Sequence, residues 1–426
     1  MDENRIHNGN RIHKDTDRNQ WKRTAALFLA SQCVTLFGST LVQMAVVWYV
    51  TVKTSSGAWV GAVSICSYLP QFLISFPGGA WADRYNRKAL ISGADAMTAG
   101  VTFLMILAMP YMVTDTLLLI CLLLMSALRS VGAGIQTPAV NAVIPQIVPK
   151  EELMRYNGIN AAMQSLVQFA APAAAGALLS AGSLRDILFI DIITAAAGIS
   201  IVLCLAFPEK QGQKRNAEGE GTQDSVLSDI RKGISYAFIN HETGRLLAVY
   251  GGFVFLTVPA GYLAGLLVSR VFGSGYEYLT AVEVTGFAGM VLGGVTANIC
   301  SSLCRRWKNE SGDIILSAGL VVFGAMAVGM SLTGDFILYL IQMFVYGIAL
   351  TVIQTSITTM IQEKTDPDMQ GRVFGLLSAV YSGLMPLGML VFGAMADKIP
   401  LQWIMAGAGA GLVMMGVRAV FSGKGG

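Results

Sequence analysis

The chain has 426 residues, of which 54% are hydrophobic and only 13% are charged, and its net charge is +3. Soluble globular proteins carry about 25% charged residues, and the shortage here extends along the whole chain. This composition excludes a soluble enzyme and a protein with a single membrane anchor. The cations lie in loops and not along one stripe, so the net charge does not indicate a nucleic-acid partner, and we expect none. The composition therefore predicts an all-α polytopic membrane protein.

Residues 1–23 are polar and predict a disordered cytoplasmic tail without a cleavable signal peptide. Twelve apolar stretches follow. Each is long enough to cross the roughly 30 Å hydrocarbon core of a bilayer as a helix. The predicted transmembrane helices lie at about 24–50, 58–80, 89–110, 116–138, 156–180, 185–207, 246–270, 278–302, 312–333, 336–360, 373–395 and 400–421.

One long polar segment, 208–245, separates the first six predicted helices from the last six. Its Gly, Gln, Glu and Lys residues are typical of a flexible linker. The predicted domains are an N-terminal six-helix bundle at 24–207, a C-terminal six-helix bundle at 246–421 and a short tail at 422–426.

Lys and Arg residues are distributed unevenly between the two ends of the predicted helices. Most of them lie in the N-terminal tail, in the loops that follow predicted helices 2, 4, 8 and 10, in the linker and at the C-terminus. The loops on the other side of the membrane hold Lys53, Arg185, Arg270 and Lys398. Cytoplasmic loops of membrane proteins are enriched in these residues, so we expect both termini to be cytoplasmic.

The second half of the chain shows a weak repetition of the first. Arg305-Arg306 and Asp313 stand in the second half where Arg87-Lys88 and Asp95 stand in the first. Duplicated six-helix units related by an axis along the membrane normal are a transporter architecture. In such transporters the substrate site lies between the halves, near the middle of the bilayer.

The loop between the second and third predicted helices reads Gly79-x-x-x-Asp83-Arg84-x-x-Arg87-Lys88. Together with the twelve helices and the central linker, this motif resembles the loop signature of the major facilitator superfamily of transporters. Asn86 stands where the family usually has glycine, and Ser301 stands in the second half at the position that matches Asp83.

Two further segments narrow this resemblance. Residues 144–149 (Ile-Pro-Gln-Ile-Val-Pro) followed by Asn157-Gly158, and the triplet Gly371-Arg372-Val373, are similar to the drug/proton antiporter branch that contains bacterial macrolide-efflux proteins and siderophore exporters. Lysophospholipid carriers are similar as well. The resemblance implies a secondary active transporter of a bacterial cytoplasmic membrane that works by alternating access.

In this family the loop motif acts as a conformational latch. The resemblance therefore implies a latch that consists of Gly79, Asp83, Arg84, Arg87, Lys88 and Arg372. Asp83 would face the amino-terminal end of the helix that starts near Arg372, where the helix dipole stabilises a carboxylate by about 0.3–1 kcal/mol. The cations would pair across the seam between the bundles. The alternative, that the cations only anchor the topology, does not account for Asp83.

Charged residues inside the predicted helices are candidates for proton coupling. Arg129 must face a partner or a water-filled cavity, because an unpaired arginine in the membrane is costly. The arginine and the glycines that follow it resemble a fourth-helix motif that is linked with proton-coupled transport in the family. The alternative role for Arg129 is a structural ion pair, for instance with Asp95.

Asp191 and Glu283 are carboxylates that could gain and lose a proton, although an interfacial pair near Arg185 is favoured over coupling for Asp191. Asp95 is also a candidate for proton coupling, although Asp95 and Asp313 are mainly expected to be structural acids at the amino-terminal ends of their helices.

The fold that the resemblance implies would place the substrate cavity among helices 1, 4, 7 and 10, assisted by helices 2, 5, 8 and 11. Scattered amides and aromatic rings on these helices suit a large amphipathic ligand, although interhelical hydrogen bonds are the alternative for each of them. The candidates are Gln43, Trp48, Tyr68, Gln71, Gln164, Gln168, Tyr262, Tyr346, Gln354 and Tyr381.

The sequence as a whole favours proton-coupled efflux of an amphipathic, macrolide-like compound. The alternatives are a lysophospholipid, siderophore or metabolite carrier of the same fold, and a membrane receptor or scaffold without transport. No nucleophile–base pair, metal-ligand set or phosphate-binding loop is present, so we expect neither an enzyme nor a metal or organic cofactor. The proton gradient would supply the driving force. The expected partners are the substrate and the lipid bilayer, and the expected state is a monomer.

Overall fold

The structure is a computed structural model of the chain, and it describes residues 3–149, 152–205, 240–305, 311–366 and 369–422. Every regular element in these ranges is a helix. The chain divides into two compact units: unit 1 contains Met1–Val46 and Cys66–Glu218, and unit 2 contains Val47–Ile65 and Gly219–Gly426. The turn between the first two helices therefore groups with the second half of the chain. Most of the predicted linker lies outside the described residues.

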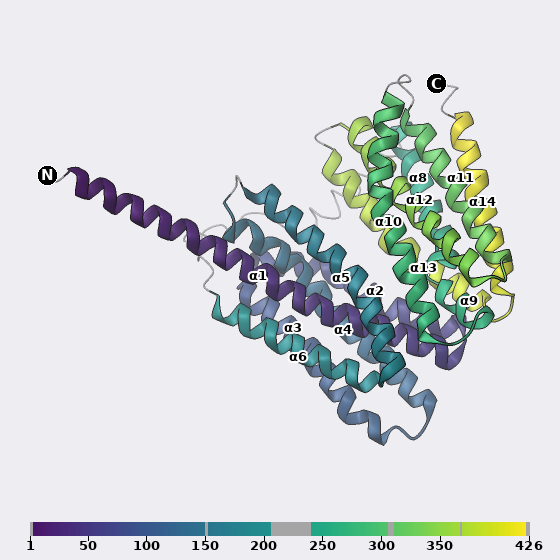
Figure 1. The fold of residues 1–426 in the computed structure, drawn as a ribbon, viewed down its shortest axis with the longest axis horizontal. Helices are drawn as coiled ribbons and strands as arrows, with labels where there is room; N and C mark the ends of the chain where they lie inside the picture. The colour runs from purple at the N-terminus through teal and green to yellow at the C-terminus, as the bar shows by residue number, and fades with distance from the viewer. Residues whose placement is uncertain (1–2, 150–151, 206–239, 306–310, 367–368, 423–426) are drawn as a thin grey trace. The chain divides into compact units, whose positions relative to one another are not determined.

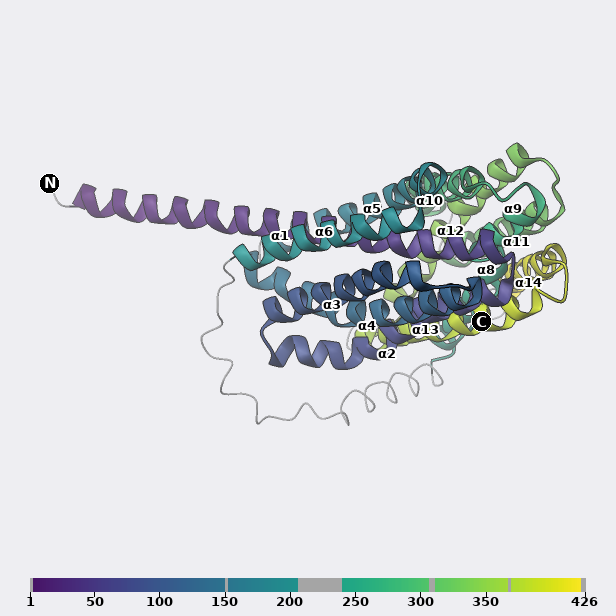
Figure 2. The ribbon, with the colours of Figure 1, turned by 90° about the horizontal axis from the view of Figure 1, so that it is seen from below.

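Unit 1 is a bundle of six long helices, labelled in Figure 1. Its elements are α1 (Glu3–Thr54), α2 (Gly57–Arg84), α3 (Arg87–Ala108), the short 3-10 helix η1 (Met109–Tyr111), α4 (Asp115–Ile147), α5 (Leu153–Ala181) and α6 (Leu184–Cys204). Within this unit α3 packs against α4 and α6, and Figure 2 shows α3 and α4 side by side.

Local sequence signals account for where these helices begin. The side chain of Asn86 accepts hydrogen bonds from the backbone N–H groups of Lys88 and Ala89 at the start of α3. Thr114 accepts from the backbone of Leu117 at the start of α4. Ser183 and Asp186 form a capping box at the start of α6.

Unit 2 holds the remaining helices. They are α8 (His241–Gly261), α9 (Ala264–Val271), α10 (Tyr276–Arg305), α11 (Ser311–Leu332), α12 (Phe336–Lys364), α13 (Gln370–Met395) and α14 (Leu401–Ser422). Within it α11 packs against α14 and α12, α10 packs against α12, and α8 packs against α13 and α14. The predicted seventh span is thus two helices, α8 and α9, with a break two residues after Pro259.

Eleven helices in the described residues are long and apolar enough to cross a membrane. The twelfth predicted span, 400–421, corresponds to α14, which is rich in alanine and glycine and is not among the eleven. The N-terminal expectation needs correction: α1 begins at Glu3, so the polar stretch predicted to be disordered is the first part of a 52-residue helix. Side chains before Trp21 lie outside those that the structure describes.

Glycines allow α10 and α12 to pack backbone against backbone. A Cβ atom at Gly289 would lie 2.1 Å from the carbonyl oxygen of Phe344, and one at Gly347 would lie 2.2 Å from that of Gly286. No side chain fits at either position without separating the helices. Such contacts between small residues are a main source of helix association in membranes.

We expect Gly347→Val to lower the thermal stability of the detergent-purified protein, by the roughly 1–3 kcal/mol typical of overpacking or more. The comparison variant is Gly294→Ala in α10, where a Cβ atom would meet nothing within 4 Å. It should leave the melting temperature close to that of the wild type. Equal melting temperatures for the two variants would contradict the close α10–α12 contact.

Candidate functional site

A buried ion pair joins three helices of unit 1. The guanidinium of Arg129 in α4 donates through Nη1 and Nη2 to the two carboxylate oxygens of Asp191 in α6. Thr102 in α3 donates its hydroxyl to Asp191 Oδ2 at 3.0 Å and accepts from Arg129 Nη1. The Arg129 and Asp191 side chains are only 9% and 4% exposed. The structural partner of Arg129 is therefore Asp191 and not Asp95, and Asp191 is not an interfacial partner of Arg185.

The glycines that follow Arg129 allow α4 to approach its neighbours. A Cβ atom at Gly132 would lie 2.6 Å from Thr98 Cγ2 of α3. One at Gly134 would lie 2.8 Å from the carbonyl oxygen of Gln71 in α2. The small residues after Arg129 therefore have a packing role, and they hold α4 close enough to α3 for the Thr102 contact.

A second buried carboxylate lies on the same α3–α4 seam. Asp95 is 4% exposed, and its Oδ1 accepts a hydrogen bond of 2.7 Å from Gln136 Nε2. Within the described residues its Oδ2 has no hydrogen-bond partner. Asp95 stands seven residues before Thr102, and Gln136 seven after Arg129, so the two contacts are about 10 Å apart along the helices.

Thr102 and Gln136 are two residues of this network that the sequence-based list of candidates lacks. Gln136 lies two helical turns after Arg129, on the same face of α4, and this spacing is a usable signal. Thr102 carries no such signal, because a threonine inside an apolar helix is common. The position opposite Arg129 depends on the rotation of α3, which the sequence does not define.

The loop motif binds helix carbonyl groups within unit 1. Arg87 donates from Nε to the carbonyl oxygen of Ala82 and from Nη1 to that of Ala142, each at 2.7 Å. Lys88 Nζ donates to the carbonyl oxygens of Leu203 and Leu205, at 2.6 and 2.8 Å, at the end of α6. A cation at a helix C-terminus stabilises the exposed carbonyl groups there. The structure thus gives both cations roles within unit 1, where the sequence predicts pairing between the bundles.

Among the side chains that the structure describes, no contact supports a latch role for the other predicted residues, Gly79, Asp83, Arg84 and Arg372. Arg84 is exposed, and a Cβ atom at Gly79 would meet nothing within 4 Å. The side chains of Asp83 and Arg372 lie outside those that the structure describes. The predicted contact between Asp83 and the start of α13 therefore stays a prediction.

Unit 2 carries its own charged cluster where α8, α11 and α12 meet. Asp313 forms ion pairs with Arg245 at 2.6 Å and with Lys364 at 3.4 Å. Glu242 forms ion pairs with the same two cations, at 3.3 and 2.6 Å. Asp313 corresponds to Asp95 in the repeat, so the two halves differ here: the second acid is ion-paired and the first is not among the ion pairs of the described residues.

The predicted cavity residues differ in exposure. Trp48 is 3% and Tyr346 2% exposed, and Tyr346 stacks on Phe323 with ring centroids 3.9 Å apart. These two side chains are core residues, so neither lines an open cavity in this structure. Tyr262 and Tyr381 share a hydrogen bond of 2.8 Å between their hydroxyl groups. The half-buried cavity candidates include Gln43 and Gln71, and the exposed ones are Tyr68, Gln164, Gln168 and Gln354. Glu283, a candidate for proton coupling, is half-buried.

Helix α5 exposes two opposite faces of different character. Ile159, Leu166 and Phe169 form an exposed apolar face that suits lipid. Asn157, Gln164 and Gln168 are exposed on the other side, at the i, i+7 and i+11 positions of one helical face. Exposed amides inside an apolar helix are costly in hydrocarbon and are expected to border water or protein.

Metal ligands do not gather in the part of the chain that the structure describes: it contains no group of three or more His, Cys, Asp or Glu side chains that could hold an ion. The buried network of unit 1 described above instead combines a guanidinium, two carboxylates, an amide and a hydroxyl. These groups can exchange hydrogen bonds and a proton.

Comparisons with known proteins agree with this architecture. Residues 28–389 match the description of the Major Facilitator Superfamily. The chain is 26% identical to macrolide efflux protein A of Streptococcus pyogenes over 383 residues, which cover 89% of this chain and 91% of that protein. It is 25% identical to macrolide efflux protein A of Enterococcus faecalis over 334 residues, which cover 78% of this chain and 99% of that protein. A crystal structure of a bacterial homologue of the iron transporter ferroportin, in an inward-facing state, superposes with a TM-score of 0.70 at 16% identity, covering 93% of this chain and 98% of that one.

Proposed function

The chain belongs to the major facilitator superfamily of membrane transporters, and on that premise we propose that it exports an amphipathic small molecule in exchange for protons. The similarity to two macrolide efflux proteins supports a macrolide-like substrate. The transporter would work as a monomer in a bacterial cytoplasmic membrane, with both termini cytoplasmic. It would use the proton gradient and neither a metal nor an organic cofactor.

The observation that carries this proposal is the pair of buried contacts on the α3–α4 seam. Breaking a buried ion pair costs several kcal/mol, whereas replacing the whole pair by apolar residues is often neutral. A chain that only needed a stable bundle would therefore not need Arg129 and Asp191. Their presence inside apolar helices favours a role in transport.

Asp95 is the better proton carrier of the two carboxylates in this network. Both oxygens of Asp191 are engaged by Arg129 or Thr102, so adding a proton there would disturb the ion pair. A proton can be added to Oδ2 of Asp95 without breaking any hydrogen bond that the structure describes. Gln136 donates a hydrogen bond to Asp95 and precedes the exposed residues Thr137 and Asn141 in α4. It would therefore link the protonation of Asp95 to this exposed part of α4.

The polar face of α5 would form part of the substrate pathway. Asn157, Gln164 and Gln168 offer amide donors and acceptors without formal charge. In the second half, Gln354 and Thr355 of α12 are also exposed and polar. Amides of this kind can hydrogen-bond the many oxygens of a macrolide-like molecule without selecting for a charged group.

We expect the double variant Gln164→Leu/Gln168→Leu to reduce export severalfold while the protein still inserts and folds. The leucines remove four hydrogen-bonding groups from the proposed pathway, and a leucine on a membrane helix costs little. Leu166→Ala, on the opposite face of α5, is the matched control and should leave export unchanged. Equal export by the double variant and the wild type would remove α5 from the pathway.

The test of the proposed function is macrolide or dye efflux from a transporter-deficient bacterium that expresses the protein, with and without a protonophore. Export that collapses when the protonophore is added supports proton coupling. Export that survives the protonophore contradicts proton coupling. No export of any amphipathic compound by the properly inserted protein contradicts the drug-efflux assignment and favours a lipid, siderophore or metabolite carrier.

A further inference from the structure

The turn between α1 and α2 is held by the second half of the chain. The chain leaves unit 1 after Val46, turns within unit 2 and returns to unit 1 at Cys66. We call residues 47–65 the α1–α2 hairpin. Its tip is the dipeptide Ser55-Ser56 between the end of α1 and the start of α2. Ser55 has φ +49°, the only positive φ outside glycine in the described residues, so this turn is strained.

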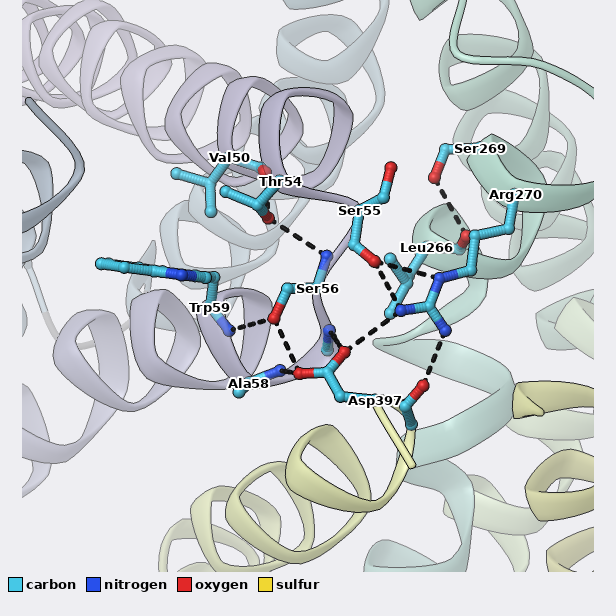
Figure 3. Close-up of polar contacts among 12 residues, drawn as sticks. Val50, Thr54, Ser55, Ser56, Ala58, Trp59, Leu266, Ser269, Arg270 and Asp397 are labelled. Carbon is cyan, nitrogen blue, oxygen red and sulfur yellow. Dashed lines mark hydrogen bonds and ion pairs between the residues drawn. The ribbon is translucent and has the colours of Figure 1, made fainter. Parts of the chain in front are cut away.

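Asp397, two residues after α13, caps the first turn of α2 (Figure 3). Its Oδ1 accepts from the backbone N–H of Gly57 at 2.6 Å. Its Oδ2 accepts from the backbone N–H of Ala58 at 2.9 Å and from the hydroxyl of Ser56 at 2.7 Å. A carboxylate thus satisfies N–H groups that a helix start leaves unpaired, from a position 340 residues away in the sequence.

Arg270, near the end of α9, completes the attachment. It donates from Nε to the carbonyl oxygen of Ser55 at 3.1 Å, and from Nη2 to the same oxygen. It also donates to the carbonyl oxygen of Ala396 at 2.7 Å and forms an ion pair with Asp397 at 3.2 Å. Figure 3 shows its guanidinium between the tip of the hairpin and Asp397. Arg270 therefore binds the strained residue and also positions the capping carboxylate.

Below the tip, the glycines of the hairpin lie close to the backbone of α13. A Cβ atom at Gly57 would lie 2.5 Å from the carbonyl oxygen of Gly393. One at Gly61 would lie 2.8 Å from the carbonyl oxygen of Met389. Small residues allow such close approach of two helix backbones.

We propose that Asp397 and Arg270 form a releasable latch that holds the α1–α2 hairpin in one state of the transport cycle and lets it go in the other. The latch joins segments through exposed polar groups, since the Arg270 and Asp397 side chains are 28% and 30% exposed. It holds a strained turn, and directly below it Gly57 and Gly61 lie against the backbone of α13. Releasing it would let the hairpin move with the rest of α1 and α2. This inference rests on the proposed transport function.

The latch stays charged at neutral pH. Partial burial alone would raise the pKa of Asp397, but the hydrogen bonds from Ala58, Ser56, Gly57 and Arg270 outweigh it and hold the pKa below its ordinary value. A lowered pKa in the latched state means that the stabilisation is complete above the ordinary pKa and is lost as the pH falls through the lowered one. The proton that is exchanged for substrate is therefore assigned to Asp95 and not to Asp397. The latch would open and close with the conformation of the transporter and not with the pH.

Hydrogen–deuterium exchange of the purified, lipid-reconstituted protein tests the attachment directly. In Asp397→Ala, exchange in a peptide that covers residues 55–60 should accelerate by about 10- to 100-fold, the range expected when hydrogen bonds to a charged group are lost. Exchange elsewhere in α13 and α10 should stay within error of the wild type. Unchanged exchange at 55–60, or acceleration throughout unit 2, would overturn the latch.

The matched control for exchange is Asp335→Ala. Asp335 caps α12 by accepting from the backbone N–H of Leu338 at 2.8 Å, three residues away. It is a carboxylate cap of the same kind in the same unit, but it makes a local contact. Its loss should accelerate exchange only at the start of α12. Acceleration at 55–60 in this variant would show that the hairpin responds to any weakening of unit 2, and this would overturn the proposal.

A cross-link tests whether the latch must open. In the variant Ser56→Cys/Asp397→Cys, oxidation or a short bis-methanethiosulfonate linker should join the two positions and stop export, and a reductant should restore it. Each single cysteine variant, treated in the same way, is the control. Export that continues with the link intact contradicts release, and failure to link contradicts the contact. If the wild type exports nothing, the proposed function fails, whereas the exchange experiment still decides the latch.

Discussion

Replacing Arg129 by alanine is expected to abolish export and to reduce the stability of unit 1 by about 3–5 kcal/mol, the cost of leaving a buried charge unpaired. The carboxylate of Asp191 would keep only its bond from Thr102. Efflux from cells and thermal unfolding of the purified protein measure the two effects. The matched control is Arg155→Ala: Arg155 is 71% exposed and pairs with Glu152 at 3.5 Å, so its loss should change stability little.

The double variant Arg129→Ala/Asp191→Ala separates the two roles of the ion pair. Without either charge, unit 1 should recover most of its stability, because no unpaired ion remains. Export should stay absent if the pair acts in transport. Recovery of export together with stability would mean that the pair is only structural, and it would remove the observation on which the proposed function rests.

The variant Asp95→Asn is expected to abolish export driven by a pH gradient while the protein stays folded. Asparagine keeps an oxygen that can accept the hydrogen bond from Gln136 but cannot carry a proton. Proteoliposomes with an imposed pH gradient measure substrate accumulation, and a pH dye measures proton release on substrate binding. Both signals should fall to the level of liposomes without protein, whereas exchange of substrate at equal pH should continue.

The control for this variant lies in the second half of the chain. Asp313 occupies the position that corresponds to Asp95 and is ion-paired with Arg245 and Lys364. Asp313→Asn should lower stability and leave the coupling intact. If Asp95→Asn still accumulates substrate with the pH gradient, the proton is carried elsewhere, and Glu283→Gln is the next variant to measure.

The positions of most helices could be predicted from hydropathy alone. The predicted span 312–333 corresponds to α11 (Ser311–Leu332), and 185–207 corresponds to α6 (Leu184–Cys204). A predominantly apolar stretch of this length forms a helix in a bilayer, because the helix satisfies its own backbone polar groups. Hydropathy fails where the chain is polar or broken, which is why it missed the early start of α1 and the break between α8 and α9.

Pairing inside the bundle could be predicted only in part. A buried arginine must have a partner, so the sequence establishes that Arg129 has one. The sequence does not establish which, because Asp95 and Asp191 are both acids at a plausible depth and the rotation of each helix decides between them. The structure selects Asp191 for Arg129 and Gln136 for Asp95.

Asn86 shows how a departure from a motif becomes understandable in the structure. The family usually has glycine at this position of the loop, and the sequence alone offers no reason for the change. The side chain of Asn86 caps α3 with hydrogen bonds of 3.0 and 3.3 Å to the backbone of Lys88 and Ala89. Asparagine is among the strongest capping residues, so the substitution stabilises the start of α3.

The contact between Arg129 and Asp191 also sets a time at which unit 1 can complete its packing during synthesis. The two residues are 62 positions apart, and at about 5–20 residues per second the ribosome needs roughly 3–12 s to make the second after the first. During that time α4 carries a cation whose insertion at the middle of a helix costs about 2.5–3.5 kcal/mol. The many apolar residues of α4 offset this cost, but the cation gains its counter-ion only when α6 is made. We therefore expect unit 1 to reach its final packing only after α6 has been inserted.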